Sequence, residues 1–143
     1  MSRCEPAASS VRAKPDIVLT EMEIRVFAVY IAVTLLASAA NGYASHLSFI
    51  RHESVKATAD KTRVPQSWMV PLGVLLAAGA LGLLVGFAVP LLGTLAAVGL
   101  VLYFLGALGA HLRARNYQLG APAFFLSLAA AALAVNLAYR TPW

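Results

Sequence analysis

The chain has 143 residues, of which 60% are hydrophobic and 12% are charged. A soluble domain of this size is nearer half apolar and a quarter charged, so the composition excludes an ordinary soluble domain. The net charge of +5 would suit a nucleic-acid-binding protein. However, the Lys and Arg residues lie in the tail and between hydrophobic runs, which is typical of membrane-protein loops, and no nucleic-acid partner is expected. The single cysteine, Cys4, excludes an internal disulfide and a CxxC redox centre.

Residues 1–23 are predicted to form a polar N-terminal tail of mixed charge, interrupted by Pro6 and Pro15. Such a segment is either disordered or forms a short surface helix that begins near Thr20. We do not expect a signal peptide, because no apolar core follows the basic residues before Glu21 and Glu23.

The first membrane span is predicted over residues 24–45. Small polar residues recur along it and just beyond it at intervals of four and three, which places them on one face of a helix: Thr34, Ser38, Asn41, Ser45 and Ser48. Ordinary helix packing explains most of this stripe, since small residues let backbones approach and hydroxyls bond across helices. A carboxamide in hydrocarbon needs a partner, so Asn41 is predicted to face the bundle interior.

Residues 46–68 form the longest connection, which we predict to be an amphipathic interfacial segment followed by a turn at Pro65. Trp68 is expected at the headgroup level of the membrane. His46 and Glu53 raise the question of a metal site, but their spacing matches no metal-binding signature, so none is predicted.

The second span is predicted over residues 69–87. Ala78, Gly82 and Gly86 form a small-xxx-small run, which permits close helix contact. A tight turn around Pro90 leads to the third span, over residues 91–110. His111 begins the polar, cationic segment HLRARN that closes this span, which is favourable at a helix C-terminus and typical of a membrane edge.

The fourth span is predicted over residues 121–139, with Pro122 in its first turn and Asn136 as its one strongly polar group. Residues 140–143 form a C-terminal tail. The sequence therefore predicts an all-α, polytopic membrane protein, with a four-transmembrane-helix bundle over residues 24–139.

Four spans place both termini on one side of the membrane and the loops 46–68 and 111–120 on the other. Five Lys or Arg residues lie on the terminal side, and the two loops hold six: Arg51, Lys56, Lys61, Arg63, Arg113 and Arg115. The positive-inside rule then favours both loops in the cytoplasm, and we expect the membrane to be a bacterial plasma membrane.

The polar ends of the first and third spans suggest a site, because His46 and His111 close these spans on the same side. By the rise of a helix, Asn41 lies about 7 Å deeper than His46, and Tyr103 about 12 Å deeper than His111. These four residues are predicted to line an antechamber. From the loop, His52 and Glu53 are expected to cap it.

Two roles are predicted in this antechamber. The catalytic candidates are His46, His111 and Glu53, since an imidazole and a carboxylate can exchange protons near neutral pH. The ligand-binding candidates are Asn41, Tyr103 and His52. Alternatively, the two span-closing histidines simply contact headgroups and water. No nucleophile triad, phosphate loop or nucleotide motif is present. The cofactor stays unknown from the sequence, and such a cluster could bind the head of a quinone or another lipophilic ligand.

Three segments carry a family resemblance: ASAANGYA at 37–44, PLGVLLAAGALGLLVG at 71–86 and GALGAHLRARN at 106–116. Through them the chain resembles the DoxX-like family of small four-helix membrane proteins, over roughly residues 27–138. The resemblance implies a subunit of the kind associated with thiosulfate:quinone oxidoreduction or with other membrane redox complexes.

Two departures from the family pattern concern charged residues. Many members carry a Lys shortly after the glycine of the first span, whereas here Gly42 is followed by Tyr43, Ala44, Ser45 and His46. Many also carry a Glu in the middle of the second span, where this chain has Leu76. His111 matches a histidine that relatives have at the end of the third span. The resemblance therefore implies a role for His111 before any other residue.

Three functions remain open from the sequence. The first is a DoxX-like protein that binds a lipophilic ligand such as a quinone, or that supports a membrane redox complex. The second is a small membrane enzyme, an isomerase, cyclase or epoxide-opening enzyme, acting on a lipophilic substrate. The third is a structural membrane protein without a ligand. The expected partners are the lipid bilayer and either a lipophilic small molecule or a redox-complex subunit, with homo-oligomers possible.

Overall fold

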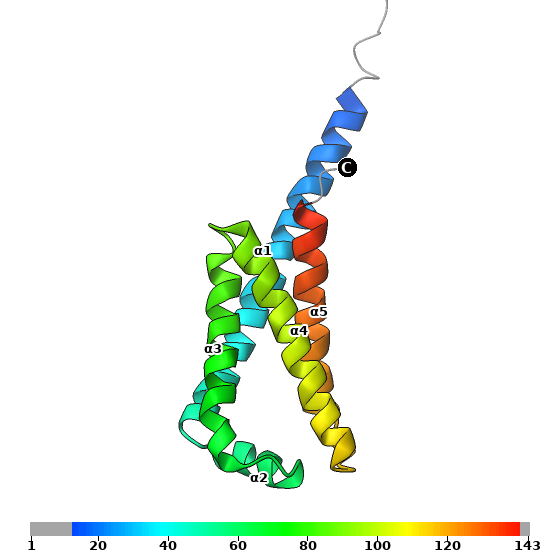
Figure 1. The fold of residues 1–143 in the computed structure, drawn as a ribbon. Coiled ribbons are helices and arrows are strands. Elements are labelled where there is room, and N and C mark those ends of the chain that lie inside the picture. Colours follow the sequence, from blue (N-terminus) through cyan, green and yellow to red (C-terminus); the bar gives the residue numbers. More distant parts are fainter. Residues whose placement is uncertain (1–12, 141–143) are drawn as a thin grey trace, which may run out of the picture.

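The computed structural model describes residues 13–140, which form helices and connecting turns without any strand (Figure 1). The elements in chain order are α1 (Ala13–Phe49), α2 (Glu53–Lys61), the 3-10 helix η1 (Gln66–Trp68), α3 (Met69–Val85), α4 (Pro90–Arg113) and α5 (Gly120–Arg140). Four helices, α1, α3 (with η1), α4 and α5, are long and apolar enough to cross a membrane. The prediction of an all-α polytopic membrane protein is confirmed.

The helix ends differ from the predicted spans mainly at the first span. The helix α1 is continuous from Ala13, so the second half of the segment 1–23 is helical. Pro15 is accommodated in its first turn, where no intrahelical bond to its nitrogen is lost. The rest of the predicted N-terminal tail, with Cys4, and residues 141–143 of the predicted C-terminal tail lie outside the described residues.

The four long helices pack in a ring in which α1 contacts α3 and α5, and α4 contacts α3 and α5. Large residues (Leu76, Leu83, Leu100 and Phe104) form half of the buried apolar cluster at the centre of this ring. The other half consists of small residues: Ala37, Ala97, Ala129 and Ala132. Such residues let helix backbones approach closely, which matters in a membrane because lipid provides no hydrophobic driving force between helices.

The outer surface is apolar, as a bilayer requires. Large side chains such as Leu91 (67% exposed) and Leu102 (64% exposed) project away from the bundle. Contiguous exposed apolar surface of this kind is unfavourable in water and matches the hydrocarbon of a membrane. The protein is therefore an integral, multi-pass membrane protein in contact with lipid.

An aromatic cluster closes the end of the bundle near the α3–α4 turn. The rings of Tyr30 and Tyr139 stack with centroids 4.9 Å apart, and the rings of Tyr30 and Phe87 meet edge to face at 5.4 Å. This cluster joins α1, α5 and the α3–α4 turn. Beyond it α1 extends past the other helices (Figure 1).

The opposite end of the bundle is crossed by α2, the short helix formed by the 46–68 connection (Figure 1). Its N-cap is His52, and Pro65 is the N-cap of η1, which leads into α3. At this end α3 and α4 lie farther apart than at their shared turn, and α2 covers the opening between them (Figure 1).

Candidate functional site

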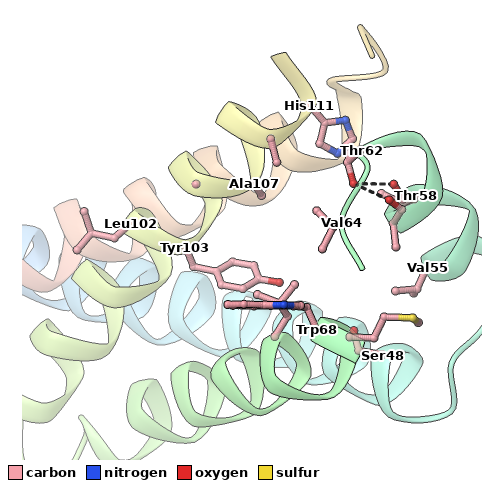
Figure 2. A pocket seen from close by; sticks show the side chains of 15 residues that line it. Ser48, Val55, Thr58, Thr62, Val64, Trp68, Leu102, Tyr103, Ala107 and His111 are labelled. Carbon is pink, nitrogen blue, oxygen red and sulfur yellow. Dashed lines mark hydrogen bonds between the residues drawn. The ribbon is translucent and has the colours of Figure 1, made fainter. Parts of the chain in front are cut away.

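A cavity of about 390 Å³ lies between α2, α3 and α4 (Figure 2). Its walls are mostly apolar side chains, including Val64, Met69 and Leu72. From α4, Tyr103 and His111 supply polar groups. The cavity is accessible from outside the bundle, because lining side chains such as Trp68 and Leu102 are also exposed on the protein surface.

The cavity follows from a gradient of side-chain size between α3 and α4. At their shared turn, a Cβ on Gly86 would lie 2.5 Å from the Cα of Gly93, so the two backbones touch. One turn farther along, a Cβ on Gly82 would lie 2.7 Å from the Cβ of Ala96. Still farther, a Cβ on Gly79 would lie 2.5 Å from a methyl group of Leu100, so α4 presents a large side chain to α3 there, and Tyr103 of α4 lines the cavity beyond it. Because interaxial distance grows with the size of the contacting side chains, the two helices diverge toward α2.

The polar part of the cavity comes from the C-terminal half of α4. Tyr103 is half-buried and points into the cavity (Figure 2). His111 is buried, and its Nδ1 lies 3.4 Å from the side-chain amide nitrogen of Asn116. In the tautomer that accepts a hydrogen bond from this amide at Nδ1, the ring N–H is at Nε2 and is a donor for other groups.

Thr62 lies beside His111 at the end of α2, as Figure 2 shows. Its hydroxyl donates to the carbonyl oxygens of Thr58 (2.8 Å) and Ala59 (3.2 Å), so its hydrogen is used by the helix end. The oxygen of this hydroxyl can still accept a bond. The hydroxyls of Ser48 and Thr58, which also line the cavity, likewise donate to backbone carbonyls of their own helices. The cavity therefore combines an apolar volume with one phenol, one imidazole, one indole and three hydroxyls whose oxygens can accept.

Two of the predicted site residues, Asn41 and His46, do not line this cavity. Asn41 is fully buried in the bundle, where its Nδ2 donates to the carbonyl of Ala37 at 2.7 Å. His46 is exposed on the outside of α1. The structure thus brings Tyr103 and His111 together and leaves Asn41 and His46 apart from them.

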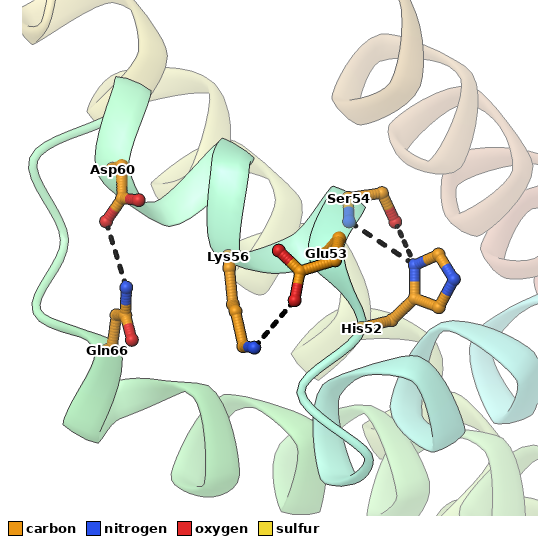
Figure 3. A network of polar contacts seen from close by, with 6 residues as sticks. All are labelled: His52, Glu53, Ser54, Lys56, Asp60 and Gln66. Carbon is orange, nitrogen blue, oxygen red and sulfur yellow. Dashed lines mark hydrogen bonds and ion pairs between the residues drawn. The ribbon is translucent and has the colours of Figure 1, made fainter.

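The remaining predicted site residues, His52 and Glu53, lie on the exposed side of α2 (Figure 3). The Nδ1 of His52 accepts from the backbone N–H of Ser54 at 3.3 Å and lies 2.9 Å from its hydroxyl, so this ring caps α2. Glu53 pairs with Lys56 at 2.8 Å. The hydrogen bond and the charge of Lys56 lower the pKa of Glu53, so this carboxylate is ionised at neutral pH.

The face of α2 that lines the cavity was not predicted from the sequence, which indicated His52 and Glu53 instead. Val55, Ala59 and Thr62 all line it, at spacings of four and three residues. This spacing marks one face of a helix and was available as a signal within the segment assigned to the interface. Within the described part of the chain, no group of three or more His, Cys, Asp or Glu residues is placed to hold a metal ion.

Comparison with known proteins gives one result. A family model described as the DoxX-like family matches residues 32–135, which is more than half of the chain. Neither the curated proteins nor the solved structures contain a match. The matched region begins within α1 and ends within α5, so it covers α3 and α4 in full, parts of α1 and α5, and every residue that lines the cavity.

Proposed function

Because the chain belongs to the DoxX-like family, we propose that it binds a lipophilic ligand from the bilayer, such as a quinone, in the cavity between α2, α3 and α4. The cavity itself carries this proposal. Its volume of about 390 Å³ falls within the range of small-molecule sites, and its apolar walls with a few polar groups are typical of them.

The polar groups suit a ligand with a carbonyl head. A quinone carries two carbonyl oxygens, which accept hydrogen bonds, on a flat apolar ring. Tyr103 offers a phenolic O–H and His111 offers its Nε2–H, both from the same helix. The exposed indole of Trp68 lies at the cavity wall, where a flat ring can pack against it.

Binding is favoured over acid–base turnover by the positions of the candidate residues. Glu53 is paired with Lys56 on the far side of α2, and His46 is outside the cavity, so the cavity has one imidazole and no carboxylate partner for it. In a redox complex, a quinone bound here would exchange electrons with a partner protein on the α2 side, near His111.

The experiment uses quenching of Trp68 fluorescence by decylubiquinone, in nanodiscs. The chain has two tryptophans, so a Trp143→Phe background isolates the signal of Trp68. We expect saturable quenching. Gly106→Leu should weaken the apparent affinity at least about tenfold, because Gly106 lines the cavity and the introduced leucine side chain would occupy part of its volume.

The matched control is Gly99→Leu on the same helix. A Cβ at Gly99 or at Gly106 meets no atom within 4 Å, so neither substitution clashes at its first carbon, and Gly99 lies outside the cavity. Gly99→Leu should leave the affinity unchanged. Linear, non-saturable quenching in the background protein, or equal affinities in the two leucine variants, would contradict the proposal.

A further inference from the structure

Three arginines adopt a backbone conformation that arginine rarely takes. Within residues 13–140, positive φ angles occur only at Arg51 (49°), Arg63 (55°) and Arg115 (54°). This is the left-handed region, where an L side chain is disfavoured and glycine is the usual residue.

Each of these arginines follows the C-terminus of a helix. The backbone N–H of the next residue reaches back to a carbonyl of the last helical turn, from His52 to Leu47 (3.0 Å), from Val64 to Ala59 (2.9 Å) and from Asn116 to His111 (2.9 Å). This bond pattern defines the Schellman motif, whose left-handed position is most often glycine. Here α1, α2 and α4 all end in the motif with arginine.

The negative ends of the helix dipoles do not explain this choice. A cation in the last turn of a helix interacts favourably with the helix dipole while its own backbone stays helical. Lys61 and Arg113 already occupy such positions in α2 and α4. The arginines therefore carry a conformational cost that the dipole does not require.

The three arginines lie at one end of the protein, the end crossed by α2 (Figure 1). They are exposed, and the only ion pair among the described side chains of residues 17–139 joins Lys56 and Glu53, so their guanidinium groups have no acidic partner within that range. The other acid of α2, Asp60, accepts from Gln66 at 3.2 Å. The exposed indole of Trp68 at the same end indicates the headgroup level of the bilayer.

We propose that Arg51, Arg63 and Arg115 bind the phosphate groups of anionic phospholipids in the leaflet at this end of the bundle. A guanidinium presents paired N–H donors that match phosphate oxygens and is more weakly hydrated than an ammonium, so it suits this role better than lysine. The left-handed backbone fixes where each arginine leaves its helix end. This surface is independent of the cavity and of the proposed ligand.

The test compares the wild type with Arg51→Gly, Arg63→Gly and Arg115→Gly in nanodiscs of phosphatidylcholine or phosphatidylglycerol. Glycine fits the left-handed position, so each variant should raise the thermal midpoint in phosphatidylcholine. In phosphatidylglycerol each should lower it, because the headgroup contact is lost. Native mass spectrometry should show the preference for phosphatidylglycerol falling about fivefold per arginine removed.

Arg25→Gln is the control, since Arg25 is a cation of α1 on the far side of the bundle from α2. It should keep the wild-type lipid preference. Two outcomes would overturn the proposal. In the first, the thermal midpoints of the glycine variants rise equally in both lipids. In the second, the glycine variants keep the same preference for phosphatidylglycerol as Arg25→Gln. Inorganic phosphate added to phosphatidylcholine nanodiscs should not stabilise the wild type; stabilisation would assign the surface to free phosphate instead of lipid.

Discussion

The buried polar side chains of α1 differ in how their hydrogen bonds are satisfied. Ser45 donates to the carbonyl of Gly73 on α3 at 2.8 Å, which joins two helices. Within the described residues, Thr34 Oγ1, Ser38 Oγ and Asn41 Oδ1 are buried without a partner. Hydrocarbon offers no water to such groups, so they give up hydrogen bonds that an aqueous state would provide. Position along one helix face therefore does not determine what a polar residue contributes.

A pair of isosteric or near-isosteric substitutions separates these two cases. Thr34→Val removes a hydroxyl that has no partner, so we expect the free energy of unfolding in bicelles to stay equal or to rise. Ser45→Ala removes the bond to Gly73 and should lower the free energy of unfolding by about 1 kcal/mol. Steric trapping measures both values. A loss in Thr34→Val as large as that in Ser45→Ala would show that the Thr34 hydroxyl has a partner, such as an internal water.

Glu53 tests whether the cavity uses a carboxylate. The pKa of Glu53 is lowered in the folded protein, so its pair with Lys56 contributes stability at pH values above the usual pKa of a glutamate. This contribution is lost as the pH falls through the lower pKa of the folded state. Between pH 8 and pH 6 the carboxylate does not titrate. We expect Glu53→Gln to leave decylubiquinone quenching of Trp68 unchanged across this range. A weaker affinity or a new pH dependence in this variant would place Glu53 in the site.

Among the helices, α3 and α4 show how glycine position sets the shape of the bundle. The backbones touch where Gly86 faces Gly93, whereas Gly99 lies on an open face of the same α4 helix. The contact at one end and the larger side chains at the other produce the opening that holds the cavity. The GxxxG motif of the sequence, Gly82 and Gly86, thus packs against α4 of the same chain.

Substitution by alanine should have opposite effects on stability at a glycine in the α3–α4 contact and at a glycine on an open face of α4. Gly86→Ala forces its Cβ to within 2.5 Å of the Gly93 backbone, so we expect a loss of roughly 1–3 kcal/mol in the free energy of unfolding. Gly99→Ala adds a methyl in open space and improves helix propensity, with an expected gain of about 0.5–1 kcal/mol. Thermal melts in one detergent would compare the two variants. Equal destabilisation would mean that the α3–α4 contact is not specific to Gly86.

The four long helices were predictable because apolar runs long enough to span a bilayer leave few alternatives. The predicted third span, 91–110, lies within α4 (Pro90–Arg113), and the fourth, 121–139, lies within α5 (Gly120–Arg140). The first span was predicted as 24–45, whereas α1 covers Ala13–Phe49. Polar residues such as Glu21 and Glu23 do not stop a helix, so hydropathy alone did not locate its start.

At the scale of the whole molecule, the candidate site was only partly predictable. Tyr103 and His111 share α4, so the local helical repeat already placed them on one element. Asn41 and His46 depend on how α1 is rotated in the bundle, and Glu53 depends on which face of α2 turns inward. These orientations arise from packing between distant segments, which spacing along the chain does not encode.

The final prediction concerns the orientation of the whole protein. We expect the end crossed by α2 to lie in the cytoplasm of a bacterial cell, because six Lys and Arg residues are located in the two loops there and none lies in the α3–α4 turn. In a Cys4→Ser background, a membrane-impermeant maleimide should label Ala88→Cys in intact spheroplasts. Ala57→Cys on α2 should be labelled only after permeabilisation, since both positions are exposed in the structure.

Removing positive charges from the two loops tests whether they determine this orientation. Changing Arg51, Arg63 and Arg115 together to Gln removes half of the loop cations and leaves five on the opposite side. Because orientation follows the bias in positive residues near the spans, this variant should show a mixed or inverted labelling pattern. Labelling of Ala57→Cys in intact spheroplasts expressing the otherwise unchanged background protein would contradict the orientation. It would also place the arginine surface and the cavity mouth at the outer leaflet.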